Sequence, residues 1–215
     1  SNNHGPFQFP EKLLPLCILN ILHGRQLPIY GDGLQIRDWL HVDDHNRGIL
    51  LVLEHGEPGQ TYNNGGNNEW ANINTVKLLC QIMDEQFADH ARLRERFPHS
   101  PAASGGNSAS LISYVTDRPG HDTRYAIDAT FISEQLGYKP EVSFDTGLRA
   151  TVQWYLENEQ WWQQILDKGY QQEAGCVSGA CCGRWPACCC LAAVLPCMRP
   201  CWKHWALRPW SPTLP

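Results

Sequence analysis

The sequence predicts a mixed α/β fold that is mostly helical and has short strands. Apolar residues recur at three- and four-residue steps in several segments, which is the period of a helix. Short β-type runs lie between them, bounded by glycine-rich turns. The length of 215 residues is enough for one domain with a substantial core.

The first predicted helix runs from Pro10 to His23. Proline suits the first helical position, and Glu11 suits the positive end of the helix dipole. Gly24 is expected to end this helix. Leu27 to Tyr30 is predicted as a short strand, followed by a tight turn at Gly31 to Gly33, where glycine can supply a positive φ.

The chain is then expected to return as a strand at Ile36 to Val42, with alternate residues on its two faces. Asp43 is predicted to cap a helix that continues to about Glu54, because its carboxylate can accept an unpaired amide. Thr61 to Asn63 is predicted as a further strand, and Gly65 and Gly66 as the loop after it.

Asn72 is expected to cap the next helix. The buried face of this helix has helical spacing and consists of Ile73, Val76, Leu79, Cys80 and Met83. Pro98 to Ser110 is rich in proline, glycine and serine, which predicts a mobile surface loop. Leu111 to Val115 is predicted as a strand.

Asp117 to Tyr125 is predicted as a polar loop. Asp128 is expected to cap a short helix that ends at Gly137. Asp145 is expected to cap a long helix that reaches about Leu166. Its predicted core face consists of Leu148, Val152, Tyr155 and Trp162.

The formal net charge is -5, which argues against non-specific nucleic-acid binding because such proteins need a basic face. The apolar runs fall short of the roughly 20 residues of a membrane helix. Only Cys17 and Cys80, of ten cysteines, precede residue 176. The small number of cysteines before residue 176 predicts a reduced, cytoplasmic protein. From the net charge and the short apolar runs we expect no nucleic-acid or membrane partner.

Composition divides the chain into residues 1–172 and a tail, residues 173–215. The tail has eight cysteines and four tryptophans, and no acidic residue follows Glu173. Paired zinc ligands at turn spacings are not evident, since most of these cysteines stand in contiguous runs. Our first hypothesis is out-of-frame translation with no ordered structure. A cysteine-rich metal-binding or scaffold segment is the alternative.

Three polar loops carry side chains without an evident structural role. Asn2, Asn3 and Lys12 lie in the opening stretch, while Tyr30, Arg37 and Asp38 flank the glycine turn. Guanidinium groups, a lysine and side-chain amides are suited to holding a diphosphate and a sugar. For Arg37, an ion pair with a neighbouring aspartate, Asp38 or Asp44, remains open.

The third polar loop, Asp117 to Arg124, concentrates charge on a rigid turn. A self-neutralising network of ion pairs is the alternative to ligand binding here. His41 and His45 lack the geometry of two metal ligands on one helical face, so no metal site is predicted.

Several segments resemble the C-terminal half of the dTDP-glucose 4,6-dehydratases, which are extended short-chain dehydrogenase/reductases. They are Ser1-Asn-Asn-His-Gly-Pro-Phe-Gln-Phe-Pro-Glu-Lys-Leu-Leu-Pro, Pro28-Ile-Tyr-Gly-Asp-Gly-Leu-Gln-Ile-Arg-Asp-Trp, Val42-Asp-Asp-His, Tyr62-Asn-Asn-Gly-Gly and Asp117-Arg-Pro-Gly-His-Asp-Thr-Arg-Tyr-Ala-Ile-Asp. They occur in the family's order and cover residues 1 to about 170.

The resemblance implies a nucleotide-sugar-binding domain, with the Rossmann domain largely missing from this chain. It also implies NAD as cofactor, a dTDP-sugar substrate and a homodimer. Hydride would leave sugar C4 for NAD, water would be lost across C5 and C6, and hydride would return to C6. The catalytic residues of the family precede the matching segment, so no catalytic residue is expected here, and the chain alone is expected to be inactive.

The resemblance also assigns individual positions. Asn3 corresponds to a residue that meets NAD. The positions that correspond to substrate ligands are Asn2, Lys12, Leu13, Pro28, Ile29, Tyr30, Arg37, Asn72, Asp117, Arg118, Pro119, Gly120, His121 and, more loosely, Tyr170. His4 and Phe7 depart from the family's usual tyrosines beside the sugar site. The alternatives are a non-catalytic nucleotide-sugar-binding module and a related NAD-dependent epimerase or dehydratase.

Overall fold

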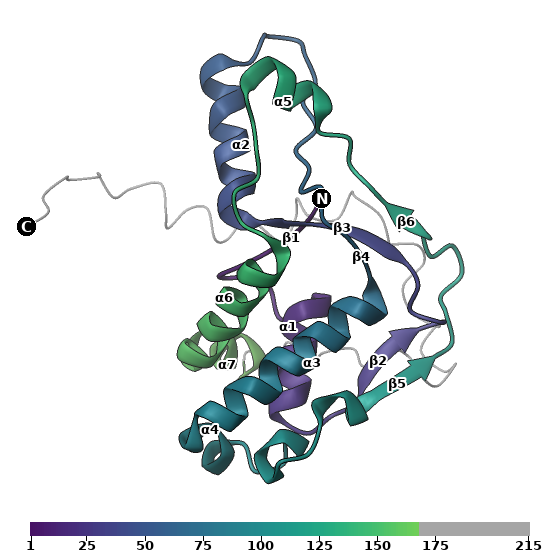
Figure 1. Ribbon diagram of the computed structural model, residues 1–215, viewed down its shortest axis with the longest axis vertical. Coiled ribbons are helices and arrows are strands. Elements are labelled where there is room, and N and C mark those ends of the chain that lie inside the picture. Colours follow the sequence, from purple (N-terminus) through teal and green to yellow (C-terminus); the bar gives the residue numbers. More distant parts are fainter. Residues whose placement is uncertain (168–215) are drawn as a thin grey trace, which may run out of the picture. The chain divides into compact units, whose positions relative to one another are not determined.

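The computed structural model describes residues 1–167, which belong to one compact unit. Helices predominate and the strands are short, so the predicted mostly helical α/β class is confirmed (Figure 1). The predicted ligand Tyr170, the boundary at residue 172 and the cysteine-rich tail lie outside the described residues.

Strand β3 (Ile36–His41) is the centre of the larger sheet. β1 (Asn2–His4) runs parallel to it, with Asn2 opposite Trp39 and His4 opposite His41. β4 (Glu69–Ala71) pairs antiparallel and β6 (Arg124–Tyr125) pairs parallel with the other half of β3. One strand therefore connects the opening stretch of the chain with the polar loop before β6.

Two further strands, β2 (Leu27–Tyr30) and β5 (Ile112–Val115), form a parallel pair. The predicted bounds of β2 are confirmed, and so is the turn after it. The amide of Gly33 donates to the carbonyl of Tyr30 at 3.1 Å. Gly31 and Gly33 have φ angles of 60° and 75°, which glycine adopts without strain.

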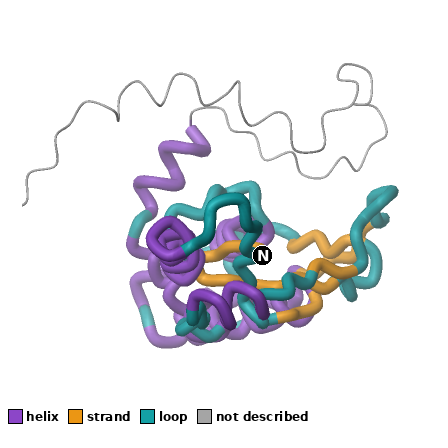
Figure 2. The backbone as a smooth tube through the Cα atoms, turned by 90° about the horizontal axis from the view of Figure 1, so that it is seen from above, coloured by secondary structure: helices purple, strands orange, loops and turns teal. Residues whose placement is uncertain are grey.

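The helices flank these strands, and Figure 2 shows the strands running side by side among them. In Figure 1, α2 and α5 lie on one side of β1 and β3, and α1, α3 and α6 on the other. The helices are α1 (Leu13–Leu22), α2 (Val42–His55), α3 (Asn72–Asp89), α4 (Ala91–Arg96), α5 (Thr130–Leu136), α6 (Phe144–Glu157) and α7 (Glu159–Asp167), with two 3-10 helices, η1 (Pro101–Ser104) and η2 (Ser108–Leu111).

The main core lies between α1, α3 and α6. Leu14 and Ile18 of α1, Leu79 of α3 and Leu148 of α6 are completely buried. Each such side chain contributes about 1.5–3 kcal/mol by leaving water. Both predicted apolar faces, from Ile73 to Met83 and from Leu148 to Trp162, are confirmed as buried. A smaller cluster around Ile132 joins α5 to α2.

The first helix begins later than predicted, at Leu13, because residues 10–12 form a turn. Pro15, not Pro10, stands in its first turn, where a missing N–H costs no intrahelical bond. The predicted end is confirmed: Gly24 has a φ of 65°, and its amide donates to the carbonyl of Ile21.

Three predicted caps are wrong by one or two residues. His41 caps α2, because its Nδ1 accepts from the amide of Asp43 at 3.3 Å. At α3 the first amides donate to carbonyls instead, Asn72 to Gln35 and Ile73 to Gly33, so Asn72 is not a cap. Ser143 caps α6 through the amide of Thr146.

The predicted long final helix is also wrong, since α6 ends at Glu157 and α7 starts at Glu159. At the break, both the backbone and the side-chain amide of Asn158 donate to the carbonyl of Trp154 at 2.9 Å. The short helix before it is confirmed, and Gly137 ends it with a φ of 68°. Its predicted cap is also wrong by one residue, since Ala129 occupies the cap position and the Asp128 carboxylate accepts from the amide of Thr130 from one residue further out.

Two loops and strands differ from prediction. Residues 61–63 form no strand, and β4 takes the place beside β3 instead. Pro98 to Ser110 is not an open loop, since it contains η1 and η2 packed against α3. The amide and hydroxyl of Ser108 donate to the Asp84 carboxylate at 3.0 and 2.5 Å.

Strand β3 is covered on both faces, with Arg37 to His41 all buried, so its predicted alternation does not separate a wet face from a dry one. Helix α4 was not predicted. In residues 1–167, the longest and most apolar helices fall short of what a bilayer crossing requires.

Candidate functional site

The candidate site lies where the parallel strands β2 and β5 end at the same edge. The Gly31–Gly33 turn follows β2, and the loop from Asp117 follows β5. The amide of Gly31 donates to the carbonyl of Val115 at 2.9 Å, which ties the two segments together. A Cβ at position 31 would come within 3.0 Å of the Asp117 carboxylate. Glycine is therefore required for this close approach as well as for the turn.

The predicted rigid turn in the second segment is confirmed. The amide of His121 donates to the carbonyl of Arg118 at 3.2 Å, and Gly120 between them has a φ of 71°. Proline at the second position and a glycine with positive φ at the third are typical of a type II turn. This turn returns the chain so that His121 faces Asp117.

A row of hydrogen bonds connects the three segments. The Gln35 amide donates to the carbonyl of Tyr30 at 3.2 Å and to the Asp117 carboxylate at 3.1 Å. Nδ1 of His121 lies 2.7 Å from the other oxygen of Asp117, and Nε2 lies 3.0 Å from Nη2 of Arg37. The side chains thus form a continuous row of hydrogen bonds, in the order Gln35, Asp117, His121 and Arg37.

Electrostatics at this row favour a charged carboxylate. The hydrogen bond from His121 is the main cause that lowers the pKa of Asp117, with further bonds from the amide of Arg118 and the side chain of Gln35. Burial lowers the pKa of Arg37, because this residue is only 6% exposed to solvent. A guanidinium remains charged despite such a shift.

Arg37 is held from several sides. Its Nη1 donates to the carbonyl of Ile36 at 2.7 Å, and its Nη2 donates to the carbonyl of Asp122 at 3.0 Å. The guanidinium carbon lies 4.8 Å from the centre of the Tyr125 ring. The alternative of an Arg37 ion pair with Asp38 or Asp44 is wrong, since Asp38 accepts backbone amides and Asp44 pairs with Arg47.

The ion-pair alternative for the Asp117–Arg124 loop is correct in part. Arg124 forms two bonds to the Glu69 carboxylate, at 2.7 and 2.8 Å, and the hydroxyl of Tyr125 donates to Asp122 at 2.5 Å. Arg118 stays exposed. The charges near Arg124 are therefore compensated within the protein, while the guanidinium of Arg118 at the turn stays open to solvent.

The strand residues predicted to line the nucleotide pocket have unequal exposure. Tyr30 is 37% exposed, and its ring meets that of His121 edge-on at 6.1 Å between centres. Pro28 is half-buried. Ile29 is only 2% exposed and belongs to the core, so its side chain supports the strand more than it lines a surface.

Two buried oxygens near the row have no hydrogen-bond partner within residues 1–167. They are Oε1 of Gln35 and Oδ1 of Asn72. The backbone joins these residues, because the amide of Asn72 donates to the carbonyl of Gln35 at 3.0 Å. Unsatisfied buried acceptors are unusual in native proteins and are suited to donors from a ligand.

A second group of predicted residues lies at the other end of β3. Asn2 and Asn3 are on β1, opposite Trp39 and Leu40. Oδ1 of Asn3 is buried without a partner in the described part of the chain, while its carbonyl accepts from the Gln8 side chain at 2.8 Å. An unfilled acceptor of this kind suits a hydroxyl or amide donor of a bound dinucleotide.

Lys12 and Leu13, which are also predicted substrate positions, stand at the start of α1. Lys12 is the residue that precedes the helix, its side chain is exposed, and its ammonium pairs with Glu11 at 2.8 Å. Leu13 is partly buried against the main core. Asn2 and Asn3 are connected to Arg37 through β3, since they pair with Trp39 and Leu40 of that strand.

Sequence reasoning missed one residue, Gln35, and the structural role of another, Asp38. Gln35 is buried and donates hydrogen bonds to both Tyr30 and Asp117. The sequence feature that could have indicated it is a polar residue between the glycine turn and the strand that contains Arg37. Asp38 is 1% exposed and accepts from the amides of Gly66 and Asn68, both at 2.8 Å, and from the hydroxyl of Ser1. The sequence singled out Asp38 among the polar groups beside the glycine turn and as a possible ion-pair partner of Arg37, but not as the residue that fixes the loop beside β1.

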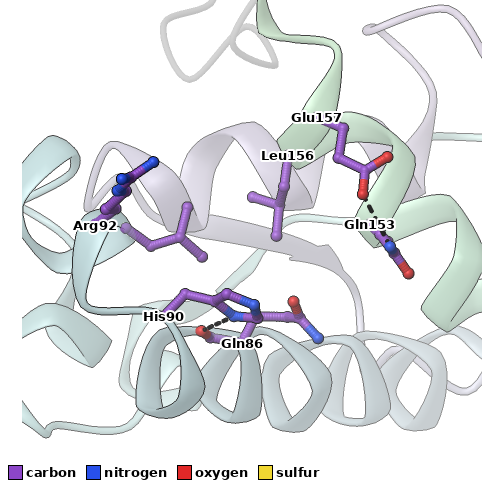
Figure 3. A pocket seen from close by; sticks show the side chains of 7 residues that line it. Gln86, His90, Arg92, Gln153, Leu156 and Glu157 are labelled. Carbon is purple, nitrogen blue, oxygen red and sulfur yellow. Dashed lines mark hydrogen bonds between the residues drawn. The ribbon is translucent and has the colours of Figure 1, made fainter.

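A pocket of about 340 Å³ lies away from both groups, between the end of α3, α4 and α6 (Figure 3). Leu93 and Leu156 are its apolar lining, with His90, Arg92 and Glu157 around it. Sequence-predicted site residues are not among its lining. Within residues 1–167, no three His, Cys, Asp or Glu side chains are gathered as metal ligands.

Comparison with known proteins gives consistent matches. The family model described as GDP-mannose 4,6 dehydratase matches residues 1–151. The chain is 51% identical over 173 residues to a dTDP-glucose 4,6-dehydratase of Escherichia coli, covering 80% of this chain and 45% of that one. The chain thus spans less than half the length of this relative.

Solved structures show the same similarity. A dTDP-glucose 4,6-dehydratase of Bacillus anthracis, in complex with NAD, superposes with a TM-score of 0.63 at 42% identity, over 77% of this chain and 45% of that one. A UDP-glucose 4-epimerase of Thermotoga maritima with UDP-glucose gives 0.58 at 27% identity, over 73% and 44%. Sequence identity is therefore higher with the dehydratase than with the epimerase.

Proposed function

The chain belongs to the GDP-mannose 4,6-dehydratase family, within the extended short-chain dehydrogenase/reductases, and we propose that it is the nucleotide-sugar-binding part of a dTDP-glucose 4,6-dehydratase. The whole enzyme would convert dTDP-glucose to dTDP-4-keto-6-deoxyglucose and water with bound NAD. The observation that supports this most is the row Gln35–Asp117–His121–Arg37, which joins segments predicted separately to hold the diphosphate.

In this proposal the β2–β5 edge holds the nucleotide diphosphate. Arg37 and Arg118 supply cations, and guanidinium groups match phosphate oxygens. Tyr30 and Pro28 offer a half-exposed apolar surface to the base, next to the free acceptors of Gln35 and Asn72. Asp117 and the type II turn keep His121 in place. The residues of this end bind and orient the substrate.

The β1 end is proposed to lie between sugar and cofactor. Asn2 would contact the sugar, and the unfilled acceptor of Asn3 fits a donor of NAD. Lys12 and Leu13 would meet the substrate at the start of α1. Bound NAD would supply the hydride acceptor for sugar C4. The chain contains no Tyr-x-x-x-Lys pair and no Gly-x-Gly-x-x-Gly motif, and we assign no catalytic residue to it.

The same family includes epimerases, and a non-catalytic binding module also fits the site. Among the solved structures, identity of 42% with the dehydratase against 27% with the epimerase favours the first proposal over the second. A cytoplasmic location is supported by the free buried thiols Cys17 and Cys80. The homodimer implied by the resemblance is tested by light scattering.

Isothermal titration of the full 215-residue chain tests the proposal. We expect binding of dTDP-glucose that is weak but at least about tenfold tighter than that of UDP-glucose or GDP-mannose, a preference of about 1.4 kcal/mol. With dTDP-glucose and NAD present, we expect no 4-keto-6-deoxy product from the chain alone. Equal affinity for the three nucleotide sugars would contradict the assignment, and turnover would contradict the absence of catalytic residues.

A further inference from the structure

The hydrogen bonds around His121 fix the position of its ring proton. Arg37 has donors only, so Nε2 of His121, 3.0 Å from Nη2, must be the acceptor. The ring of a neutral histidine then carries its proton on Nδ1, which donates to Asp117 at 2.7 Å. His121 is neutral in this arrangement and both of its nitrogens are engaged.

This arrangement has no donor from His121 available for a phosphate. Its one N–H points to Asp117, and both hydrogens on Nη2 of Arg37 are used, by His121 and by the carbonyl of Asp122 at 3.0 Å. Phosphate oxygens accept hydrogen bonds and cannot replace a donor. A diphosphate can therefore gain these donors only if the bond between Arg37 and His121 is broken.

Addition of a proton to Nε2 breaks that bond and preserves the rest of the row. Nδ1 still donates to Asp117, whose charge then compensates the imidazolium. Nε2 becomes a donor, and it repels Arg37, so Nη2 is released. The groups that face His121 are Asp117 from its own loop, Arg37 from β3 and the ring of Tyr30 from β2. Around Arg37 lie Asp122, Tyr125 and Arg118.

Two cations facing each other are unfavourable without an anion between them. A bound diphosphate supplies that anion, so ligand binding and protonation of His121 favour each other. Building on the proposed function, we propose that binding of dTDP-glucose takes up one proton from solvent at Nε2 of His121 and transfers the Arg37 donor from that nitrogen to the diphosphate. His121 is then a binding residue only in its charged form.

Titration calorimetry of the full chain in buffers of different ionisation enthalpy measures this proton directly. dTDP-glucose is the suitable ligand, since both ends of its diphosphate are esterified and its charge is constant between pH 6 and 8. We expect net proton uptake, of up to one proton per ligand bound, and an affinity that rises as pH falls, by at most about tenfold per pH unit.

The variant His121→Gln shows whether the proton taken up on binding goes to His121 or to another group. Glutamine retains an acceptor and a donor but does not titrate, so we expect binding that is weaker, with no proton uptake and little pH dependence. His90→Gln is the matched control, because the Nδ1 of His90 also bonds to a protein acceptor, the carbonyl of Gln86 at 3.0 Å, in the remote pocket. It should behave as the wild type.

Each other outcome contradicts a defined claim. Binding without proton uptake in the wild type, or uptake that persists in His121→Gln, overturns this inference and leaves the proposed function intact. Loss of all nucleotide-sugar binding in the wild type overturns the proposed function and the proton uptake together. In the ligand-free chain, ¹⁵N NMR should show a protonated Nδ1 and an unprotonated Nε2 on His121 at pH 8. The opposite tautomer would overturn the inference whether or not ligand binds.

Discussion

The two ends of β3 differ in how their polar groups are satisfied. At the Ile36–Arg37 end, a row of side chains from three segments is closed by hydrogen bonds at 2.7–3.1 Å, apart from an amide bond from Gln35 to the Tyr30 carbonyl at 3.2 Å. At the Trp39–His41 end, beside β1, the side-chain oxygens of Asn3 and Gln8 are buried and lack partners within residues 1–167. Oε1 of Gln35 and Oδ1 of Asn72 also lack partners beside the row within residues 1–167, so the two ends differ in the row of hydrogen bonds itself. We call the end that has the row the closed end and the end beside β1 the open end.

This difference indicates that the two ends bind in different ways. At the closed end a ligand exchanges existing hydrogen bonds for new ones, and the positions of the side chains are set in advance, which reduces the ordering cost of binding. At the open end a ligand fills acceptors that are otherwise unsatisfied, which is favourable because an unpaired buried acceptor is costly. Variants at the nucleotide end should therefore remove a donor that the ligand would take over. Variants at the β1 end should remove an acceptor that the ligand would satisfy.

Removal of the Asp38 carboxylate, which holds the loop beside β1, should have the largest effect on the free energy of unfolding. Asp38→Ala leaves the amides of the buried Gly66 and the half-buried Asn68 without their acceptor. We expect the free energy of unfolding to fall by about 3 kcal/mol, since each unsatisfied group costs about 1–3 kcal/mol. Urea unfolding followed by circular dichroism measures it. Asp43→Ala, at a 70% exposed carboxylate nearby, should change stability by less than about 0.5 kcal/mol.

Acid should weaken the open end through His4. Burial, and then the charge of His41, lowers the pKa of His4 to about 4. The unfolded chain takes up this proton near pH 6.5 while the folded chain resists it until about pH 4. Stability should therefore decrease as pH falls through this window, by a total on the order of 3 kcal/mol.

The variant His4→Phe tests this window, because phenylalanine suits the surrounding rings of Trp39 and Phe144 and does not titrate. Its stability should change less between pH 6.5 and 4 than that of the wild type. An identical pH profile in both proteins would show that another group controls acid sensitivity. His55→Gln, at an exposed histidine, should retain the wild-type profile.

Loss of the cation should weaken binding at the closed end. Arg37→Met removes charge-assisted hydrogen bonds worth about 1.5–3 kcal/mol each, so the affinity for dTDP-glucose should fall about ten- to hundredfold. Calorimetry measures this change. Arg124→Met is the matched control, since Arg124 is occupied by Glu69 at 2.7 Å, and it should bind nearly as the wild type does. Equal losses in both variants would indicate only a general charge effect.

The smallest effect is expected at Asn3, because its side-chain oxygen has no partner to lose. Asn3→Leu should leave the free energy of unfolding within about 0.5 kcal/mol of the wild type, since replacing an unpaired polar group by an apolar one is nearly neutral. Asn20→Leu should cost about 1 kcal/mol, because the amide of Asn20 donates to the carbonyl of Gln26 at 2.9 Å. Comparable losses would mean that Asn3 has a partner in the folded chain.

The sequence was sufficient for features set by local chemistry. The Gly31–Gly33 turn, the ends at Gly24 and Gly137 and the buried face of α3 follow from backbone freedom and periodicity. Features set by tertiary pairing were missed. The caps of α2 and α3 moved because β3 and Gln35 supplied the partners, and Pro98 to Ser110 became ordered through Asp84, which is distant in sequence.

The site divides in the same way. Residue types and family resemblance identified Arg37, Asp117 and His121, but the residue that joins them, Gln35, depends on the approach of β2 to the β5–β6 loop. No local signal marks such a contact. The proton on Nδ1 of His121 likewise follows from the position of Arg37, 84 residues away in sequence.

Mapping of dTDP-glucose on the full chain by amide chemical-shift changes tests the central claim most directly. The account predicts changes concentrated at Tyr30 to Arg37 and at Asp117 to Tyr125, which disappear in Arg37→Met. Changes concentrated instead around Gln86, His90 and Glu157, the residues of the pocket in Figure 3, would contradict it.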